Sequence, residues 1–203
     1  MTDRAELKLV LFDLGGVLLH LNDPLITFGL DCSEAEFHQT WLLSPAVREF
    51  ERGAITAEQF ASSVTREMQL PYDAKMFLER FVAWPGSPFP DAIDLVGRIP
   101  EHYACAILSN TNALHWQSLD IDSRFGNRFE RYFLSYETGL LKPDDQAFAN
   151  VAEQYDCAPE EILFFDDNPL NVSAANEMGM HAILCRTGAD LADALVDRGI
   201  VEA

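Results

Sequence analysis

Carboxylate side chains stand at two places where an apolar run of the chain ends. Asp13 follows the run Leu9–Phe12 and precedes a leucine and two glycines, and Asp166 and Asp167 follow the run Ile162–Phe165. An aspartate that ends a buried strand can act as a nucleophile or as a metal ligand. Two adjacent carboxylates at a buried edge are costly unless a cation or hydrogen-bond donors offset their charge. Because hard oxygen ligands suit Mg²⁺ better than softer ions, the three aspartates predict a magnesium site.

Two further polar segments could bind an anion. Ser109 and Asn110 follow another apolar run, and Lys142 lies in the segment GLLKPD, just before an expected helix. Taken singly, the first segment is more typical of a helix cap and turn, and the second of a surface lysine. The chain carries a formal net charge of −19, so an anionic substrate would need local positive charge. Lys142 and Mg²⁺ would supply it.

The elements that must position these side chains are short apolar runs that alternate with helical patterns. We expect strands at residues 8–12, 103–108, 131–134, 162–165 and 182–185. Five strands with helices between them predict an α/β fold with a doubly wound parallel five-stranded sheet. Such sheets bind ligands at the carboxyl ends of their strands, where the aspartates and Ser109 lie.

A long stretch between the first two expected strands does not fit this repeat. Residues from about 22 to 84 lack a clear strand and show helical spacing of apolar side chains. We interpret them as an inserted α-helical cap of some four helices. This interpretation assigns residues 1–20 and 86–203 to the α/β core and residues 21–85 to the cap. The cluster Pro85, Gly86, Pro88 and Pro90 is interpreted as the return linker.

Local patterns mark the starts of three helices. Thr56 predicts an N-cap, and Ser33 with Glu36 predicts a capping box. Pro143 is expected in the first turn of a helix, with acidic residues directly after it at the positive end of the helix dipole.

Length and composition limit the size, compartment and partners of the protein. With 203 residues, the chain can form one α/β domain with a modest insertion. We expect a cytoplasmic protein, because the sequence has neither an apolar run of about 18 residues nor a signal-peptide pattern. The four cysteines show no metal-binding spacing, which favours reduced thiols. The acidic charge argues against nucleic acid and anionic membranes as partners.

The order of these motifs resembles that of the haloacid dehalogenase-like (HAD) hydrolases, in the branch whose helical cap is inserted after the first motif. The resemblance covers essentially the whole chain and is carried by LVLFDLGGVL, LSNTN, GLLKPD and FFDDN. It is weaker in the cap, where only FERGAITAEQF is similar. The motifs are most similar to those of bacterial sugar phosphatases of the α-glucose-1-phosphatase type, and next to those of the phosphatase domain of epoxide hydrolases.

The resemblance implies a Mg²⁺-dependent phosphatase of small phosphorylated metabolites, chiefly sugar phosphates. It makes Asp13 the nucleophile, which becomes an aspartyl-phosphate that water then hydrolyses. It assigns Mg²⁺ to Asp13, the backbone carbonyl of Gly15 and Asp167, with Asp166 as an outer or water-mediated partner.

The resemblance also implies a phosphate site. Ser109 and the backbone of Asn110 would bind the phosphate, and Lys142 would neutralise nucleophile and phosphate together. Such clamping of spread oxygen charge is the main catalytic demand in phosphoryl transfer.

Gly15 departs from the pattern of most phosphatases of this family, which carry a second aspartate there to protonate the leaving oxygen and activate water. Loss of such a group costs about 10²–10⁴-fold in rate. The motif of the sugar phosphatases named above also resembles Asp-Leu-Gly at these positions, so glycine does not by itself indicate an inactive protein. One alternative is a catalytically weak or inactive HAD-fold binding protein, which the retained Asp13, Lys142 and acidic pair disfavour. Another is a 2-haloacid dehalogenase, whose chemistry needs neither that acid nor Mg²⁺.

Substrate choice is expected to lie in the cap, where the sequence says less. Arg48, Arg52 and Trp41 could reach a sugar or a phosphate, although a solvated helix face and core packing are the simpler interpretations. His115 could line the pocket as a general acid, or it could lie on the surface of a helix. The oligomeric state is not set by the sequence.

Overall fold

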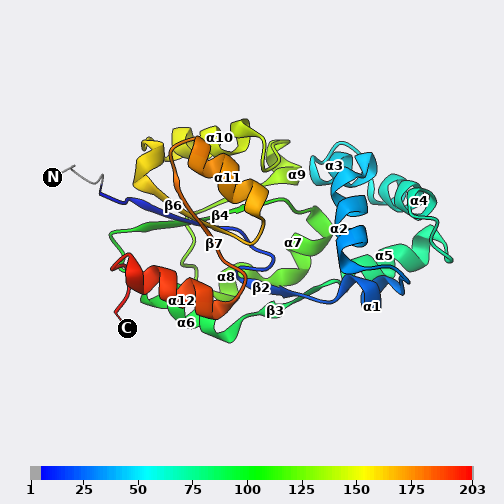
Figure 1. The fold of residues 1–203 in the computed structure, drawn as a ribbon, viewed down its shortest axis with the longest axis horizontal. Helices are drawn as coiled ribbons and strands as arrows, with labels where there is room; N and C mark the ends of the chain where they lie inside the picture. Colours follow the sequence, from blue (N-terminus) through cyan, green and yellow to red (C-terminus); the bar gives the residue numbers. More distant parts are fainter. Residues whose placement is uncertain (1–5, 203) are drawn as a thin grey trace.

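A five-stranded parallel sheet forms the centre of the molecule, which we describe over residues 6–202 of a computed structural model (Figure 1). Residues 1–5 and 203, the two ends of the expected core, lie outside the described residues. The strand order is β5–β4–β1–β6–β7. The strands are β1 (Leu9–Phe12), β4 (Ala104–Ser109), β5 (Arg131–Leu134), β6 (Ile162–Asp166) and β7 (His181–Leu184). The predicted doubly wound α/β fold is confirmed.

Helices cover both faces of this sheet. They are α6 (Pro90–Arg98), α7 (Ala113–Leu119), α8 (Ile121–Arg124), α9 (Ser135–Thr138), α10 (Asp145–Tyr155), α11 (Pro169–Glu177) and α12 (Gly188–Asp197), with a 3₁₀ turn at Pro159–Glu161. Side chains alternate along a strand, so Leu9 and Leu11 of β1 pack with α10 and α11, whereas Val10 and Phe12 pack with α6 and α12. This two-sided burial explains the continuous apolar run before Asp13. None of the helices within residues 6–202 has the length and apolar character that a bilayer crossing requires.

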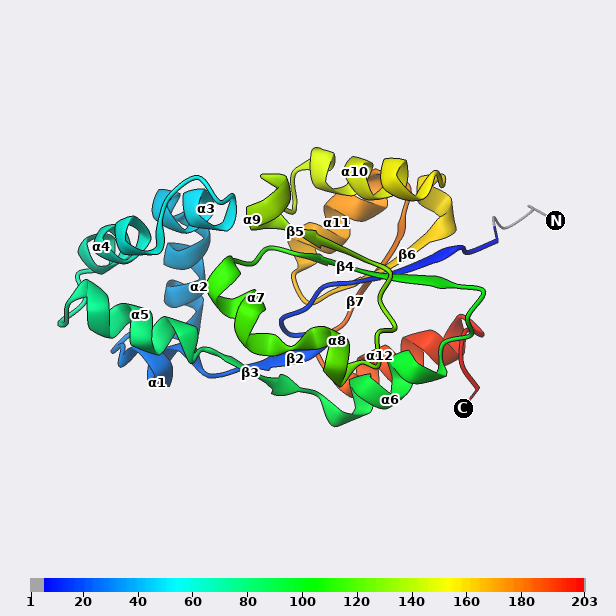
Figure 2. The same ribbon diagram turned by 180° about the vertical axis from the view of Figure 1, so that it is seen from behind.

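A second group of helices, the cap, lies beside one end of the sheet (Figure 2). It comprises α1 (Pro24–Phe28), α2 (Glu34–Leu43), α3 (Pro45–Glu51), α4 (Ala57–Glu67) and α5 (Ala74–Val82). These helices share a hydrophobic core rich in aromatic rings, among them Phe28, Phe37, Trp41, Phe60, Phe77 and Phe81. The described chain thus has one short helix more than the expected four. The domain boundaries between core and cap, placed between residues 20 and 21 and between residues 85 and 86, stay a prediction.

Two of the three predicted helix starts are confirmed. Thr56 and Ser33 are N-caps, and each forms a capping box with the residue three positions on. The expectation for Pro143 is wrong, because α10 begins at Asp145 with Asp144 as N-cap. The carbonyl oxygen of Lys142 accepts a hydrogen bond from the Asn110 side chain, 2.9 Å away, and the chain becomes helical only after this contact.

The proline-rich return segment is a strand rather than a linker. β3 (Pro85–Pro88) pairs antiparallel with β2 (Leu19–Leu21) in a two-stranded sheet. Prolines are tolerated because each of these strands has an unpaired edge. Gly86 permits the close approach, since a Cβ there would lie 3.0 Å from the backbone oxygen of His20. The two chain crossings between core and cap are therefore tied to each other.

Candidate active site

The strand ends place Asp13 and Asp166 side by side. β1 pairs in parallel with β6, with Phe12 opposite Phe165, and the backbone N–H of Asp13 donates to the carbonyl oxygen of Phe165 at 2.8 Å. Asp13 and Asp166 therefore lie at the same edge of the sheet. One carboxylate oxygen each of Asp13, Asp166 and Asp167 lies within 4.8 Å of the others. The structure thus brings the three aspartates together.

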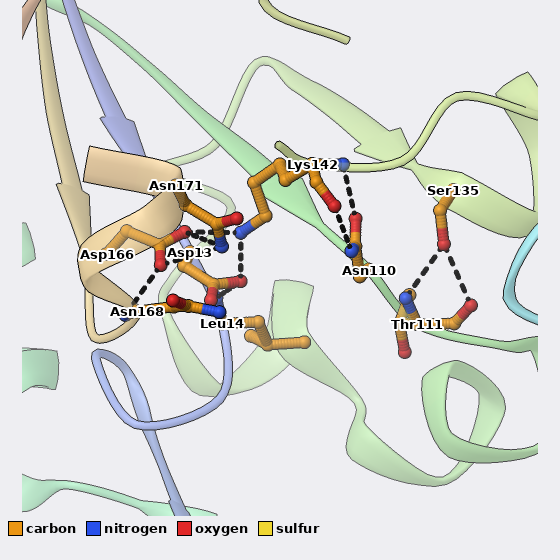
Figure 3. Close-up of polar contacts among 9 residues, drawn as sticks. All are labelled: Asp13, Leu14, Asn110, Thr111, Ser135, Lys142, Asp166, Asn168 and Asn171. Atoms are coloured by element: carbon orange, nitrogen blue, oxygen red, sulfur yellow. Dashed lines mark hydrogen bonds and ion pairs between the residues drawn. The ribbon is translucent and has the colours of Figure 1, made fainter. Parts of the chain in front are cut away.

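The ammonium of Lys142 lies between two of these carboxylates (Figure 3). Its Nζ is 2.8 Å from Asp13 Oδ1 and 2.6 Å from Asp166 Oδ2. Burial lowers the pKa of Lys142, but the two carboxylates outweigh burial and leave that pKa above its ordinary value. Lys142 is therefore a buried cation, and the surface position that its sequence context favours is wrong.

The two members of the acidic pair have different surroundings. Asp166 is fully buried, and its Oδ1 accepts from the backbone N–H of Asn168 and from the Asn171 amide, each at 2.9 Å. Its Oδ2 accepts from Lys142. The Asp167 carboxylate, by contrast, accepts no hydrogen bond from another residue of the described chain. Asp167 is therefore free to meet a cation, whereas Asp166 holds Lys142 in place.

The charge of this cluster suits a divalent cation. Three carboxylates and one ammonium leave two net negative charges. Burial and the neighbouring carboxylates raise the pKa of Asp13 to about 7, against the opposing charge of Lys142. Burial and the charge of Asp166 raise the pKa of Asp167 as well. A hard cation among these oxygens would offset the repulsion, so the residues present fit Mg²⁺.

Gly15 contributes no side chain to the site. A Cβ built there would have only side-chain atoms of Leu21 as its nearest neighbours, at 3.3 to 3.5 Å, and the backbone of Gly15 is not in the left-handed region. A side chain could therefore stand at this position. Without one, position 15 offers only backbone groups for the chemistry.

Ser109 and Asn110 follow from β4, the other neighbour of β1. Ser109 is buried, and its hydroxyl has no hydrogen bond with another described residue, so a phosphate oxygen could take that place. The Asn110 amide accepts from the backbone N–H of Lys142 and donates to the Lys142 carbonyl oxygen, both at 2.9 Å (Figure 3). The side chain of Asn110 thus fixes the backbone that carries Lys142.

Two supporting residues escaped the sequence analysis. Asn171 binds Asp166, and its only sequence signal is an amide one turn into the helix that follows the acidic pair. The Ser135 hydroxyl accepts from the N–H of Thr111 at 2.9 Å and donates to its carbonyl oxygen at 3.0 Å. This contact ties the loop after β4 to α9, and no local pattern predicts it.

The cap residues considered for substrate contact make no hydrogen bond or ion pair with the three site aspartates in the described chain. Trp41 packs in the aromatic core of the cap. The Nη2 atoms of Arg48 and Arg52 lie 3.5 Å and 2.8 Å from Asp144 Oδ2, which belongs to the core. The arginines therefore join the cap to the core, while about two fifths of each side chain stays exposed, as expected for a solvated helix face (40% for Arg48 and 41% for Arg52).

His115 is neither a pocket acid nor a surface residue. It is 8% exposed, and its Nε2 lies 2.7 Å from the carbonyl oxygen of Phe81, at the end of the cap helix α5. Its Nδ1 lies 3.1 Å from the amide nitrogen of Asn112. Burial lowers the pKa of His115 to about 4, although the bond to Phe81 opposes this shift. The ring is therefore neutral and links α7 to the cap.

Comparison with known proteins agrees with this geometry. The chain is 27% identical over 207 residues to the D-ribitol-5-phosphate phosphatase of Bacteroides thetaiotaomicron, covering 91% of this chain and 94% of that protein. It is also 27% identical over 176 residues to a sesquiterpene phosphatase of Aspergillus oryzae, covering 85% and 87% of the two chains. A HAD family enzyme of Bacteroides thetaiotaomicron, solved with magnesium and inorganic phosphate, matches the fold with a TM-score of 0.70 and 27% identity, over 88% of this chain and 93% of that one.

The family itself follows from the match along the sequence. The family model of the haloacid dehalogenase-like hydrolases matches residues 7–179, which include the three aspartates of the site, Ser109, Asn110 and Lys142. The matched range contains the strands that carry the site as well as the cap between them. The chain therefore belongs to the haloacid dehalogenase-like hydrolase family.

Proposed function

We propose that the protein is a Mg²⁺-dependent phosphatase that hydrolyses small phosphorylated metabolites, chiefly sugar phosphates. The observation that carries this proposal is the buried ammonium of Lys142, 2.8 Å from Asp13 and 2.6 Å from Asp166. It puts a fixed positive charge beside a carboxylate at the edge of the sheet, with Asp167 free for a cation. The ribitol-phosphate phosphatase and the magnesium- and phosphate-bound neighbour support both the reaction and the metal.

Asp13 is the nucleophile in this proposal. Its Oδ1 accepts from the backbone N–H of Leu14 at 2.7 Å and from Lys142 at 2.8 Å, while Oδ2 has no partner among residues 6–202 and is free to attack phosphorus. The bond from phosphorus to the leaving oxygen breaks as the aspartyl-phosphate forms. Water then attacks phosphorus, and Asp13 leaves as a carboxylate.

The remaining residues bind and orient the phosphoryl group. Lys142, the hydroxyl of Ser109 and the backbone N–H of Asn110 donate to its oxygens. Asp13, Asp167 and the carbonyl of Gly15 would hold Mg²⁺, which supplies further positive charge to the phosphoryl oxygens when bound. Asp166 orients Lys142.

Gly15 supports a second candidate, a weak or inactive HAD-fold protein that binds phosphorylated ligands. A binding protein, however, has no need of a buried lysine held between two carboxylates. A 2-haloacid dehalogenase has less support, because its chemistry does not use the cation that the three aspartates fit.

We also propose that the protein acts in the cytoplasm on free metabolites, and that neither nucleic acid nor a membrane surface is its partner. The net charge of −19 supports the second part of this proposal, because it repels nucleic acid and anionic membranes.

Phosphate release from a panel of sugar phosphates, sugar-alcohol phosphates and p-nitrophenyl phosphate tests the proposed function. We expect release with Mg²⁺, none with EDTA, and none from the Asp13→Asn variant. If the wild-type protein binds these compounds but releases no phosphate, the binding-protein candidate replaces the phosphatase.

A further inference from the structure

The proposed reaction needs a proton donor that the core does not provide. A sugar or alkyl leaving group departs as a strongly basic alkoxide unless a positioned acid protonates it. Asp13 is the nucleophile, and Asp167 is assigned to Mg²⁺. Both oxygens of Asp166 are occupied by protein donors, and Lys142 is held between Asp13 and Asp166. Gly15 has no side chain to offer. The donor must therefore come from another element.

Two residues near the site are unsuitable as this donor. His115 has a pKa lowered to about 4 by burial, and its Nε2 is committed to the carbonyl oxygen of Phe81. Tyr136 of α9 has a pKa raised to about 12, by burial and by its neighbour Glu137. Neither side chain can give up and regain a proton readily at neutral pH.

Glu51 ends α3, the cap helix that touches the core next to the site. The next residue, Arg52, binds Asp144 at 2.8 Å, and Asp144 lies two positions after Lys142. Gly53 lies so close to Tyr136 of α9 that a Cβ on it would be 2.4 Å from the Tyr136 carbonyl oxygen. Both ribbon views show α3 beside α9 (Figures 1 and 2). These contacts hold the end of α3, which carries Glu51, against α9 and the segment that follows Lys142.

The carboxylate of Glu51 is partly buried and uncommitted. It makes no hydrogen bond or ion pair with another described residue, which is unusual for a carboxylate at a packed interface. Burial raises its pKa to about 7, while the charges of Arg48 and Lys142 act to lower it. Lys142 belongs to the core and Glu51 to the cap, so the charge of a core residue acts on a carboxylate of the cap.

Other ionisable groups of the packed elements lie around this position. Arg48 is on the same helix, Lys142 belongs to the core, and α9 contributes Tyr136 and Glu137. On α4, Glu67 accepts from Ser44, which caps the opposite end of α3.

We propose that Glu51 is the general acid and base of this enzyme and does the work of the side chain that is missing at Gly15. The inference rests on the phosphatase function proposed above. In-line displacement places the leaving oxygen on the side of phosphorus opposite Asp13, which is the side that the cap covers. A carboxyl carried by the cap would therefore lie on the side of the leaving group, whereas the core holds the nucleophile.

The proton balance closes over the two steps. In the first, Asp13 attacks phosphorus, the bond to the leaving oxygen breaks, and that oxygen takes the proton of Glu51 to give an alcohol and a Glu51 carboxylate. In the second, the Glu51 carboxylate removes a proton from water as the water oxygen attacks phosphorus. The bond between Asp13 and phosphorus breaks, phosphate is released, and Glu51 is protonated again. A carboxyl with a pKa near the working pH suits both steps.

Glu51→Gln tests the proposal, because glutamine keeps the size of the side chain and removes its exchangeable acid. With the alkyl phosphate that the wild type hydrolyses fastest, we expect kcat to fall about 10²–10⁴-fold. With p-nitrophenyl phosphate, whose leaving group needs no proton, the first step should survive. The variant should then release a burst of nitrophenolate equal to the enzyme concentration, followed by slow turnover.

Three controls accompany this variant. Glu49→Gln changes an exposed glutamate of the same helix and should leave both substrates unaffected. Gly15→Asp in the Glu51→Gln background should restore part of the alkyl phosphatase activity. For wild-type protein, kcat on the alkyl phosphate should decline above about pH 7, and Glu51→Gln should lack this decline.

The possible failures are distinguishable. If wild-type protein releases no phosphate from any compound, the proposed function fails and the role of Glu51 fails with it. If the wild type is active and Glu51→Gln loses less than tenfold on the alkyl phosphate, Glu51 is not the acid. If the variant loses alkyl turnover and the nitrophenolate burst to the same extent, Glu51 serves binding or structure, and the proposal is again overturned.

Discussion

Gly16 lies directly against the carboxylate of Asp167. A Cβ built on Gly16 would stand 2.5 Å from Asp167 Oδ2, and the φ of +77° at Gly16 is one that other residues rarely adopt. Gly16→Ala must therefore displace Asp167 or shift the loop after β1. We expect about a tenfold rise in the Mg²⁺ concentration that gives half-maximal activity, in line with other changes around metal ligands.

Gly97→Ala is the matched control for this variant. Gly97 lies within α6, and a Cβ there would meet nothing within 4 Å. We expect unchanged Mg²⁺ dependence and a gain in stability of about 0.5–1 kcal/mol. An unchanged Mg²⁺ requirement in Gly16→Ala would mean that Asp167 does not hold the metal.

Asn110→Ala should lower kcat without abolishing folding. The variant removes both hydrogen bonds that fix the Lys142 backbone, each 2.9 Å long. A misplacement of about 1 Å can cost 10²-fold in rate, so we expect a loss of about 10–100-fold. Asn150→Ala, in α10 and without a side-chain hydrogen bond in the described chain, is the control. Steady-state kinetics with p-nitrophenyl phosphate measure the effect, and equal kcat values in the two variants would contradict it.

The aspartates of the site could be predicted because their signal is local. Asp13 and Asp166 each end a short run of fully buried apolar residues, and parallel strands bring such ends to one edge. The contact of the Asn110 side chain with Lys142 carries no comparable signal. Its partner lies 32 residues away and is bound through backbone atoms, which leave no trace in residue type.

The same difference between local and non-local contacts explains which features of the cap could be predicted. Thr56 and Ser33 could be recognised as helix starts, because a cap and its partner are three residues apart. The pairing of β3 with β2 is non-local, and the prolines of β3 resemble a loop in sequence. The sequence also could not separate Glu51 from Glu49, since only the packing of α3 on α9 decides which of them is buried.

Asp144→Asn should loosen the contact between cap and core. Asp144 binds Arg52 at 2.8 Å and Arg48 at 3.5 Å, and the three side chains are 40–45% exposed. Pairs this exposed contribute at most about 1 kcal/mol each, so we expect little change in unfolding free energy. We expect instead a several-fold rise in KM for a sugar phosphate, because cap closure loses its anchor beside Glu51. Raising the salt concentration should increase KM of the wild type in the same direction.

Asp145→Asn is the control for this prediction. Asp145 is the next residue, it is exposed, and it makes no ion pair in the described chain. Its KM should match that of the wild type at every salt concentration. If Asp144→Asn and Asp145→Asn behave alike, the arginines do not anchor the cap.

His115 should make the stability of the protein depend on pH between about 4 and 6.5. Its pKa is about 4 when folded and 6.5 ordinarily, so between these values the unfolded chain binds a proton that the folded protein does not. The stabilisation is complete above pH 6.5 and is lost as the pH falls toward 4, by about 3 kcal/mol for a shift of this size.

Carboxylates also titrate in this pH range, so the measurement is the difference in unfolding free energy between wild type and His115→Gln at each pH. That difference should shrink as the pH falls. A difference that stays constant from pH 7 to pH 4.5 would mean that His115 is not held neutral between Asn112 and Phe81.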